Sequence, residues 1–334
     1  MRTVITGVAG FLGSHLADRF IAEGHEVVGV DNFLGGFKDN IPNGVDFYDF
    51  DLTDDVEHLT GIFQGADMVV HAACTAYEGL SVFSPSLITS NTVQASVNTV
   101  TAAIRAGAKK FVYLSSMARY GDQGKMCEGT DTPKPQDPYG IGKLAAENLI
   151  RNLCEIHGLE WVVIVPHNII GARQRYDDPF RNVASIMINR MLQGKQPIIY
   201  GDGTQQRCFS FVGDVVEPLF QATIRPEAAG QVFNVGPDEE TVTINHLAET
   251  IARLIGFDLD PIYMTGRPQE VKVALLSADK ARDALGYATS TSLEDGLREM
   301  IDWISARGVR EFNYELPIEI ESDLTPKTWT QRLF

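Results

Sequence analysis

Tyr139 and Lys143 stand four residues apart, and a phenol and an ammonium group at that spacing can carry out acid–base chemistry. Asp137 and Pro138 just before them are typical of the N-cap and first residue of a helix, so both side chains would share one helix face. The lysine charge favours the phenolate and lowers the tyrosine pKa toward that of an acid–base catalyst. Taken alone, the pair also fits a solvated helix face.

Ser115 and Ser116 favour the catalytic interpretation. They end a predicted strand, and doubly wound α/β proteins bind their ligands at the carboxyl ends of their strands. A serine hydroxyl at that edge would steady a substrate oxygen. The pattern therefore predicts proton transfer at a substrate hydroxyl group.

The first predicted strand is followed by Gly7, Gly10 and Gly13 in G-x-x-G-x-x-G spacing and then by a predicted helix over 11–23. Such glycines allow a tight turn and let backbone N–H groups approach a pyrophosphate. Asp31 ends the second strand, where its carboxylate would bond ribose hydroxyls and repel a 2′-phosphate. NAD is therefore favoured over NADP, although Asp31 and Asn32 could instead be an ordinary turn.

These residues need an α/β framework. From Arg2 to Pro166, β-branched runs alternate with helical patterns, which predicts a Rossmann-like, doubly wound parallel sheet. The predicted strands are 3–6, 26–30, 45–49, 67–71, 110–115 and 160–165.

The alternation loosens after Gly171, which indicates a smaller C-terminal α/β lobe over the carboxyl edge of the sheet. Helices are expected near 182–193, 214–224, 244–255 and 292–306. We expect an NAD-binding domain over 1–170 to which 208–236 returns, a substrate lobe over 171–207 and 237–311, and an extended tail over 312–334.

Composition limits the function. The chain has 334 residues, 44% of them hydrophobic, and a formal net charge of -16, which disfavours nucleic acid or an anionic membrane as a partner. No apolar stretch approaches the roughly 18 residues that would span a bilayer. The four cysteines show no C-x-x-C spacing, so neither a metal site nor a disulfide framework is indicated. A cytoplasmic enzyme is expected.

From about Met1 to Tyr287 the sequence resembles the extended short-chain dehydrogenase/reductase family, and within it the nucleotide-sugar epimerases and dehydratases. Beyond the glycines, the family's order and spacing are matched by Asp31-Asn32, Asp51-Leu52, His71-Ala72-Ala73, Asn91, Ser115-Ser116 with Tyr120-Gly121, and Tyr139 with Lys143. The resemblance implies that Ser116, Tyr139 and Lys143 are catalytic. It implies an NAD site lined by Gly7, Gly10, Phe11, Leu12, Gly13, Asp31, Asn32, Asp51, Leu52, Ala72, Ala73, Asn91, Tyr139 and Lys143.

The second half resembles the family's nucleotide-diphosphate site. Two arginines from separate segments would neutralise a diphosphate inside an otherwise acidic protein. Besides Ser116 and Tyr139, the substrate residues implied are Asn168, Asn182, Tyr200, Arg207 and Arg267.

The residues after Ser116 indicate which reaction is expected. Dehydratases of the family carry Asp-Glu there, and this chain has Met117-Ala118-Arg119. Decarboxylases carry a glutamate, and 3,5-epimerases a cysteine, in place of Ala118. What remains implies a UDP-sugar 4-epimerase, an isomerase that works through a transient 4-keto sugar.

Two residues bear on the ligands through the same resemblance. Ala274, at a place where related 4-epimerases with a bulky residue restrict N-acetylated sugars, implies a pocket for UDP-N-acetylglucosamine as well as UDP-glucose. His167 replaces an aromatic residue beside Asn168 and would contact nicotinamide or substrate, or else be a packed loop histidine.

Two other functions stay open. A nucleotide-sugar 4-dehydrogenase or reductase would differ only in releasing NADH instead of returning the hydride to the same sugar. A non-catalytic NAD-binding scaffold is the second, because one fold can serve without chemistry. Family members commonly pair through helices near 91–107 and 139–157, which implies a homodimer, and Leu144, Leu149, Ile150 and Leu153 are spaced compatibly.

Overall fold

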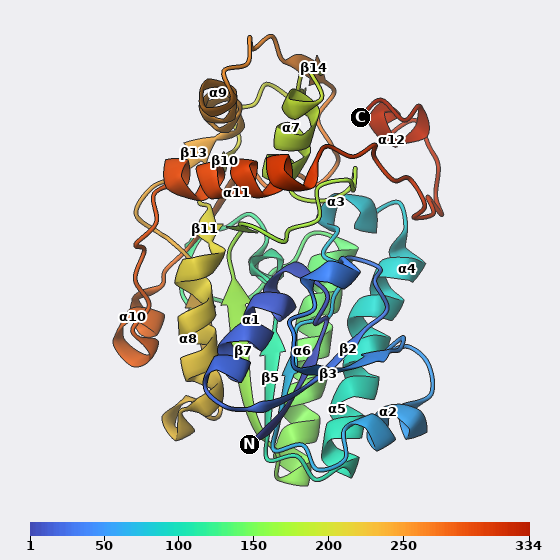
Figure 1. The fold of residues 1–334 in the computed structure, drawn as a ribbon, viewed down its shortest axis with the longest axis vertical. Helices are drawn as coiled ribbons and strands as arrows, with labels where there is room; N and C mark the ends of the chain where they lie inside the picture. Colours follow the sequence, from blue (N-terminus) through green and yellow to red (C-terminus); the bar gives the residue numbers. More distant parts are fainter.

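A parallel sheet of seven strands forms the centre of the computed structural model, which describes residues 1–334 (Figure 1). The predicted strands are all present, and β12 joins the sheet beside β7. In spatial order the strands are β12 (Gln231–Val235), β7 (Glu160–Pro166), β5 (Lys110–Leu114), β4 (Met68–His71), β1 (Arg2–Thr6), β2 (Glu26–Asp31) and β3 (Val45–Asp49).

The strand order places a ligand-binding crevice beside β1. The chain adds β2 and β3 on one side of β1, then returns to add β4, β5 and β7 on the other. Loops leaving β1 and β4 therefore turn away from each other at the carboxyl edge, and ligands bind at such a switch point in doubly wound sheets.

Helices cover both faces of the sheet, because its strands bury side chains on both sides. Helices α1 (Phe11–Ala22) and α8 (Val212–Ile224) pack over one face, where Leu16 and Leu219 join a core with Ile5. Helices α2 (Val56–Ile62), α5 (Ala95–Arg105) and α6 (Pro138–His157) cover the other face.

The second lobe stands over the carboxyl edge of the sheet (Figure 1). Its core joins α7 (Val183–Leu192), α9 (Ile244–Ile255) and α11 (Leu293–Arg307), so the predicted helices of this half are confirmed. Short strands complete it: β6 (Gly124–Met126), β8 (Ile169–Ile170), β9 (Ile198–Tyr200), β10 (Gln206–Arg207), β11 (Ser210–Phe211), β13 (Val242–Thr243), β14 (Ile262–Met264) and β15 (Val273–Leu276).

Three short helices connect these parts: α3 (Glu78–Ser81), α4 (Pro85–Thr89) and α10 (Asp279–Leu285). No helix of the structure combines the length and the apolar character needed to cross a membrane. All four cysteines are free thiols, and no group of three or more metal-ligating side chains is arranged around a common point.

Residues 312–334 are not an extended tail but a segment packed against both lobes, which we call the C-terminal strap. It contains one short helix, α12 (Lys327–Thr330), and buries Phe312, Trp329 and Phe334 in a core that also holds Tyr139. Alternating apolar side chains start the strap and pack on this core. From the sequence alone, these residues are expected only to form an extended tail.

Candidate active site

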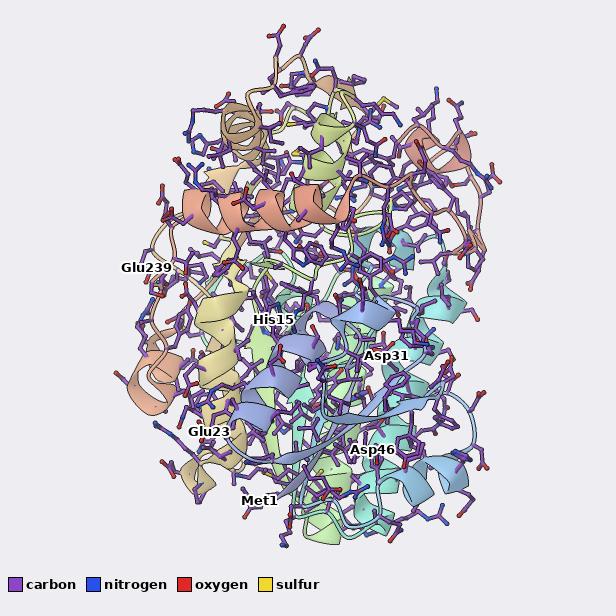
Figure 2. All side chains as sticks on the ribbon, viewed as in Figure 1. Met1, His15, Glu23, Asp31, Asp46 and Glu239 are labelled. Carbon is purple, nitrogen blue, oxygen red and sulfur yellow. The ribbon has the colours of Figure 1, made fainter.

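A cavity of about 430 Å³ opens at the carboxyl ends of the strands, beneath the second lobe. Its volume suits a small-molecule site, typically 300–1,000 Å³. Every predicted cofactor residue except His167 lines it, as do all three predicted catalytic residues. Figure 2 shows Asp31 between the two lobes and Met1 at the opposite edge of the sheet.

The glycine turn lines the cavity and packs so closely on neighbouring backbone that side chains would not fit there. Gly7 has φ +73°, and a Cβ there would come within 2.7 Å of the Ala73 backbone. A Cβ on Gly13 would stand 2.1 Å from the Gly7 carbonyl oxygen. No side chain caps α1 at its N-cap, Gly10, so its first N–H groups face the cavity and can receive an anion.

Asp31 is held at the end of β2 with its carboxylate at the cavity. Its Oδ2 accepts from Ala9 N at 3.0 Å and its Oδ1 from Phe33 N at 2.7 Å. Next to it, Asn32 Nδ2 donates to Asp51 Oδ2 at 2.8 Å. Burial raises the pKa of Asp31 and the backbone donors oppose that rise. These bonds fix the edge at which a ribose would bind.

Helix α6 positions the catalytic pair as its N-cap predicted. Asp137 Oδ1 accepts from Gly140 N at 2.9 Å, which starts the helix and places Tyr139 and Lys143 on the buried face. Lys143 Nζ donates to the Leu114 carbonyl at 2.7 Å, at the carboxyl end of β5. The strand carrying Ser116 and the helix carrying Tyr139 are thereby held together.

Burial raises the pKa of Tyr139 well above its ordinary value, and a hydrogen bond with Ser116 opposes that rise. The prediction that Lys143 lowers this pKa stays a prediction, and the net effect of the surroundings is a rise. The physical reason is the low polarity around the ring, because Tyr139 is 6% exposed and packs in an apolar core.

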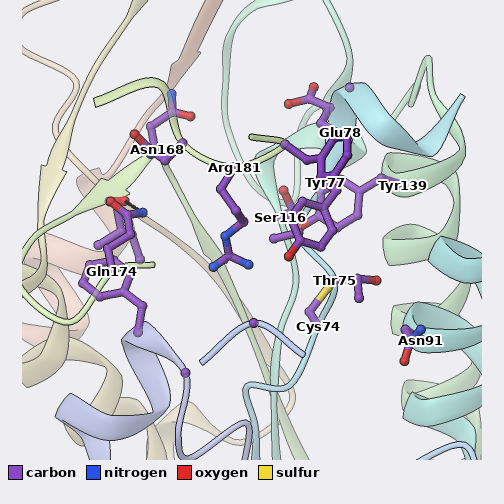
Figure 3. Close-up of a pocket in the computed structure, with 18 of the residues that line it drawn as sticks. Cys74, Thr75, Tyr77, Glu78, Asn91, Ser116, Tyr139, Asn168, Gln174 and Arg181 are labelled. Atoms are coloured by element: carbon purple, nitrogen blue, oxygen red, sulfur yellow. Dashed lines mark hydrogen bonds between the residues drawn. The ribbon is translucent and has the colours of Figure 1, made fainter. Parts of the chain in front are cut away.

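Asn168 has an amide group prepared for a ligand. Its backbone lies in the left-handed region at φ +32°, and its buried Nδ2 has no hydrogen-bond partner. Asn168 lines the cavity (Figure 3). A buried donor without a partner costs free energy unless a ligand accepts from it. Asn182 also lines the cavity, but its Oδ1 caps α7 by accepting from Ala184 N at 2.9 Å.

The two predicted diphosphate arginines meet at one wall of the cavity, although they come from separate segments. Glu270 Oε1 lies 3.9 Å from Arg207 Nη2 and 3.2 Å from Arg267 Nη2. The Arg267 guanidinium also lies over the Tyr200 ring, 4.7 Å from its centroid. A diphosphate at this wall would therefore compete with one carboxylate for two arginines.

Two predicted site residues do not reach the cavity. His167 is fully buried, its Nε2 lies 3.1 Å from the Ala274 carbonyl oxygen, and burial lowers its pKa to about 4. Ala274 is buried in β15, between β10 and β6. Neither lines the cavity in this structure, so the role of Ala274 toward N-acetylated sugars stays a prediction.

Many lining residues escaped the sequence analysis, among them Glu78, Gln174, Arg181 and Phe334. Glu78 begins the short helix α3 and Arg181 lies on the segment between β8 and α7, and Figure 3 draws both around the cavity with Ser116 and Tyr139. Phe334 brings the C-terminal strap to the cavity wall. No motif marks these residues, because loop placement depends on the tertiary fold.

Comparison with known proteins agrees with the fold. Residues 3–236 match the family described as the NAD dependent epimerase/dehydratase family. A UDP-glucose 4-epimerase of Mycolicibacterium smegmatis is 34% identical over 91% of this chain and 98% of its own.

Solved structures give the same relationship. A UDP-glucose 4-epimerase of Thermotoga maritima with UDP-glucose aligns with TM-score 0.86 and 31% identity over 92% of this chain and 99% of its own. A UDP-N-acetylglucosamine 4-epimerase of Methanobrevibacter ruminantium aligns with TM-score 0.84 and 29% identity over the same shares. The chain therefore belongs to the NAD-dependent epimerase/dehydratase family.

Proposed function

We propose that this protein is an NAD-dependent UDP-sugar 4-epimerase that interconverts UDP-glucose and UDP-galactose or their N-acetylated counterparts. The observation that carries the proposal is one cavity that joins Ser116, Tyr139 and Lys143 to Arg207 and Arg267. The first group suits oxidation of a sugar hydroxyl, and the second suits a diphosphate. The relatives named above, whose names give the same reaction, support it.

The glycine turn and the uncapped start of α1 would hold the NAD pyrophosphate, with Asp31 at the adenosine ribose. Bound there, NAD would supply hydride transfer from and back to carbon 4 of the sugar. Lys143, fixed by the Leu114 carbonyl, would hold the nicotinamide ribose and supply a positive charge beside Tyr139.

Proton transfer would fall to Tyr139, which removes the proton of the 4-hydroxyl and returns it at the end. Ser116 would donate a hydrogen bond to the same oxygen, since both side chains line the cavity and lie within hydrogen-bonding reach of each other. Arg207 and Arg267 would hold the diphosphate while the keto sugar turns its other face to the cofactor.

The residues after Ser116 favour epimerisation over elimination or decarboxylation. Met117 and Ala118 offer no acid or base to protonate a leaving hydroxyl, and Ala118 is buried. The residues after Ser116 therefore supply no group to act on carbon 5 or carbon 6, which favours return of the hydride to the keto sugar.

The test is to incubate the purified protein, with no added NAD, with UDP-glucose, UDP-N-acetylglucosamine and UDP-glucuronate in separate reactions. Chromatography should resolve a 4-epimer from UDP-glucose or UDP-N-acetylglucosamine without net NADH. NADH in proportion to product would instead establish a dehydrogenase, and loss of water or carbon dioxide would establish elimination or decarboxylation.

We further propose a cytoplasmic homodimer. Exposed apolar side chains along α6, namely Ile141, Leu149 and Ile156, offer a face for a second copy of the helix. Four free thiols agree with a reducing compartment. Light scattering should give the mass of two chains, and Ile156→Glu should reduce it to one.

A further inference from the structure

Arg181 is an arginine inside the cavity that neither the sequence pattern nor the proposed mechanism uses. It lies on the segment that leads from β8 to α7 in the second lobe. Figure 3 shows its guanidinium in the open part of the cavity, between Gln174 and Ser116. It therefore faces the space that ligands would fill.

This guanidinium forms no close ion pair, unlike its neighbours, although its charge opposes the rise in the pKa of the buried Asp178. On the same segment, Arg173 lies 2.6 Å from Asp18 and Arg175 lies 2.8 Å from Asp177. The carboxylate in the adjoining turn, Asp178, is already engaged. It accepts from Tyr77 Oη at 2.6 Å and from Phe180 N at 2.9 Å.

The side chain of Arg181 is nevertheless held in place. Its guanidinium lies over the Tyr77 ring, 5.3 Å from the centroid. Tyr77 is itself 1% exposed and fixed by its bond to Asp178. A cation held over an aromatic face keeps its N–H groups free to donate to a ligand.

The guanidinium reaches across the cavity to the cofactor side. A Cβ built on Gly35 would stand 3.3 Å from Arg181 Nη1. Gly35 belongs to the loop after β2. This loop packs directly on the glycine turn, because a Cβ built on Gly36 would stand 2.2 Å from the Ala9 carbonyl oxygen. Phe37 N also donates to that oxygen at 3.1 Å. Arg181 thus stands opposite the start of α1.

We propose that Arg181 binds a phosphate oxygen of the NAD pyrophosphate and so links the substrate lobe to the cofactor. The proposal rests on the NAD site described under the proposed function. A guanidinium donates two parallel N–H bonds to phosphate, and the uncapped N-terminus of α1 completes the anion site. The diphosphate of a nucleotide sugar has the same chemistry, but its arginines lie at another wall, with Glu270.

The experiment compares Arg181→Met, which keeps the length of the side chain, with Arg181→Lys, which keeps the charge. Release of NAD from the purified holoprotein is followed with an enzyme that consumes free NAD, and the Kd of UDP is measured by calorimetry. We expect NAD release about tenfold or more faster in Arg181→Met. Arg181→Lys should lie between this variant and the wild type, and UDP affinity should be unchanged.

Arg253→Met is the matched control, because Arg253 pairs with Glu294 on the surface of the second lobe, and its NAD release should equal that of the wild type. A tenfold loss of UDP affinity with normal NAD release would overturn the proposal and assign Arg181 to the nucleotide sugar instead. The proposal would also be overturned if NAD release and UDP affinity both stayed within twofold of wild type. A loss of UDP-glucuronate turnover alone would not change that result. NAD release and the Kd of UDP can be measured whether or not the protein epimerises a sugar. Failure of this proposal can therefore be distinguished from failure of the proposed function.

Discussion

Arg119 Nη1 lies 2.8 Å from Glu147 Oε2 in an ion pair that solvent barely reaches, with side-chain exposures of 9% and 0%. Glu147 also accepts from Ser115 Oγ at 3.2 Å. Glu147 is one helical turn beyond Lys143, and Arg119 follows Ser116 closely in the chain. The pair therefore joins the two segments that carry the catalytic residues.

Replacing Glu147 with glutamine should destabilise the protein by about 3–5 kcal/mol, because it leaves the Arg119 charge buried without a counter-ion. Urea unfolding followed by circular dichroism measures this loss. The paired replacement Arg119→Met with Glu147→Leu should recover most of it, since no buried charge remains.

The control for this pair is Glu294→Gln, which removes an exposed partner of Arg253 and Arg298. It should cost no more than about 1 kcal/mol. Equal losses in Glu294→Gln and Glu147→Gln would show that burial of the Arg119 pair has no special consequence for stability.

Tyr139→Phe should lower kcat by about 10²–10⁴-fold and leave NAD bound, because only the proton-transferring oxygen is removed.

Burial raises the Tyr139 pKa, so the wild-type rate should rise with pH as the phenolate forms. Lys143→Met should move that rise to higher pH, since a positive charge near the phenolate is lost. An unchanged pH profile in Lys143→Met would remove Lys143 from this role, and unchanged turnover in Tyr139→Phe would favour the scaffold function.

The sequence was sufficient to predict the sheet and most of the cavity, because these depend on local patterns. β-branched runs mark the strands, and Gly7 with Gly13 permits a turn that any larger residue would block. Asp137 predicted the start of α6 through its capping bond, so the positions of Tyr139 and Lys143 followed.

Features that depend on long-range contacts could not be predicted. Whether His167 faces the ligand or the core is decided by its bond to the Ala274 carbonyl, which lies on a distant strand. Glu78 and Arg181 enter the cavity from segments without motifs. The packing of the C-terminal strap depends on a few aromatic residues, which meet side chains from distant parts of the chain.

UDP should bind more weakly as the pH rises through neutrality, because of Glu78. Glu78 is exposed to the open cavity, and desolvation by the surrounding protein raises its pKa to about 7, with Asp137 raising it further and Arg207 and Arg267 opposing. Below pH 7 the carboxyl is neutral, while above it a negative charge repels the diphosphate. Calorimetry at pH 6 and pH 8 should give a Kd of UDP higher at pH 8 by up to about tenfold.

Glu78→Gln is the control for this pH effect, since its side chain keeps its size but cannot ionise. Its Kd of UDP should stay near the low-pH value of the wild type at both pH values, apart from the small change due to ionisation of UDP itself. The same pH dependence in Glu78→Gln and wild type would transfer the effect to other groups at this wall, of which Glu270 is the nearest partner of both arginines.

Trp329→Ala should test whether the C-terminal strap is part of the folded core. Trp329 is 3% exposed and packs edge-to-face on Phe180, with ring centroids 5.1 Å apart. Removing so large a buried side chain should cost about 3–5 kcal/mol in urea unfolding. Because Phe334 of the same strap lines the cavity, the Kd of UDP should rise as well.

Ile320→Ala, in an exposed part of the strap, should change stability by less than about 0.5 kcal/mol. If Trp329→Ala matched Ile320→Ala in both measurements, the strap would contribute neither to the core nor to the cavity.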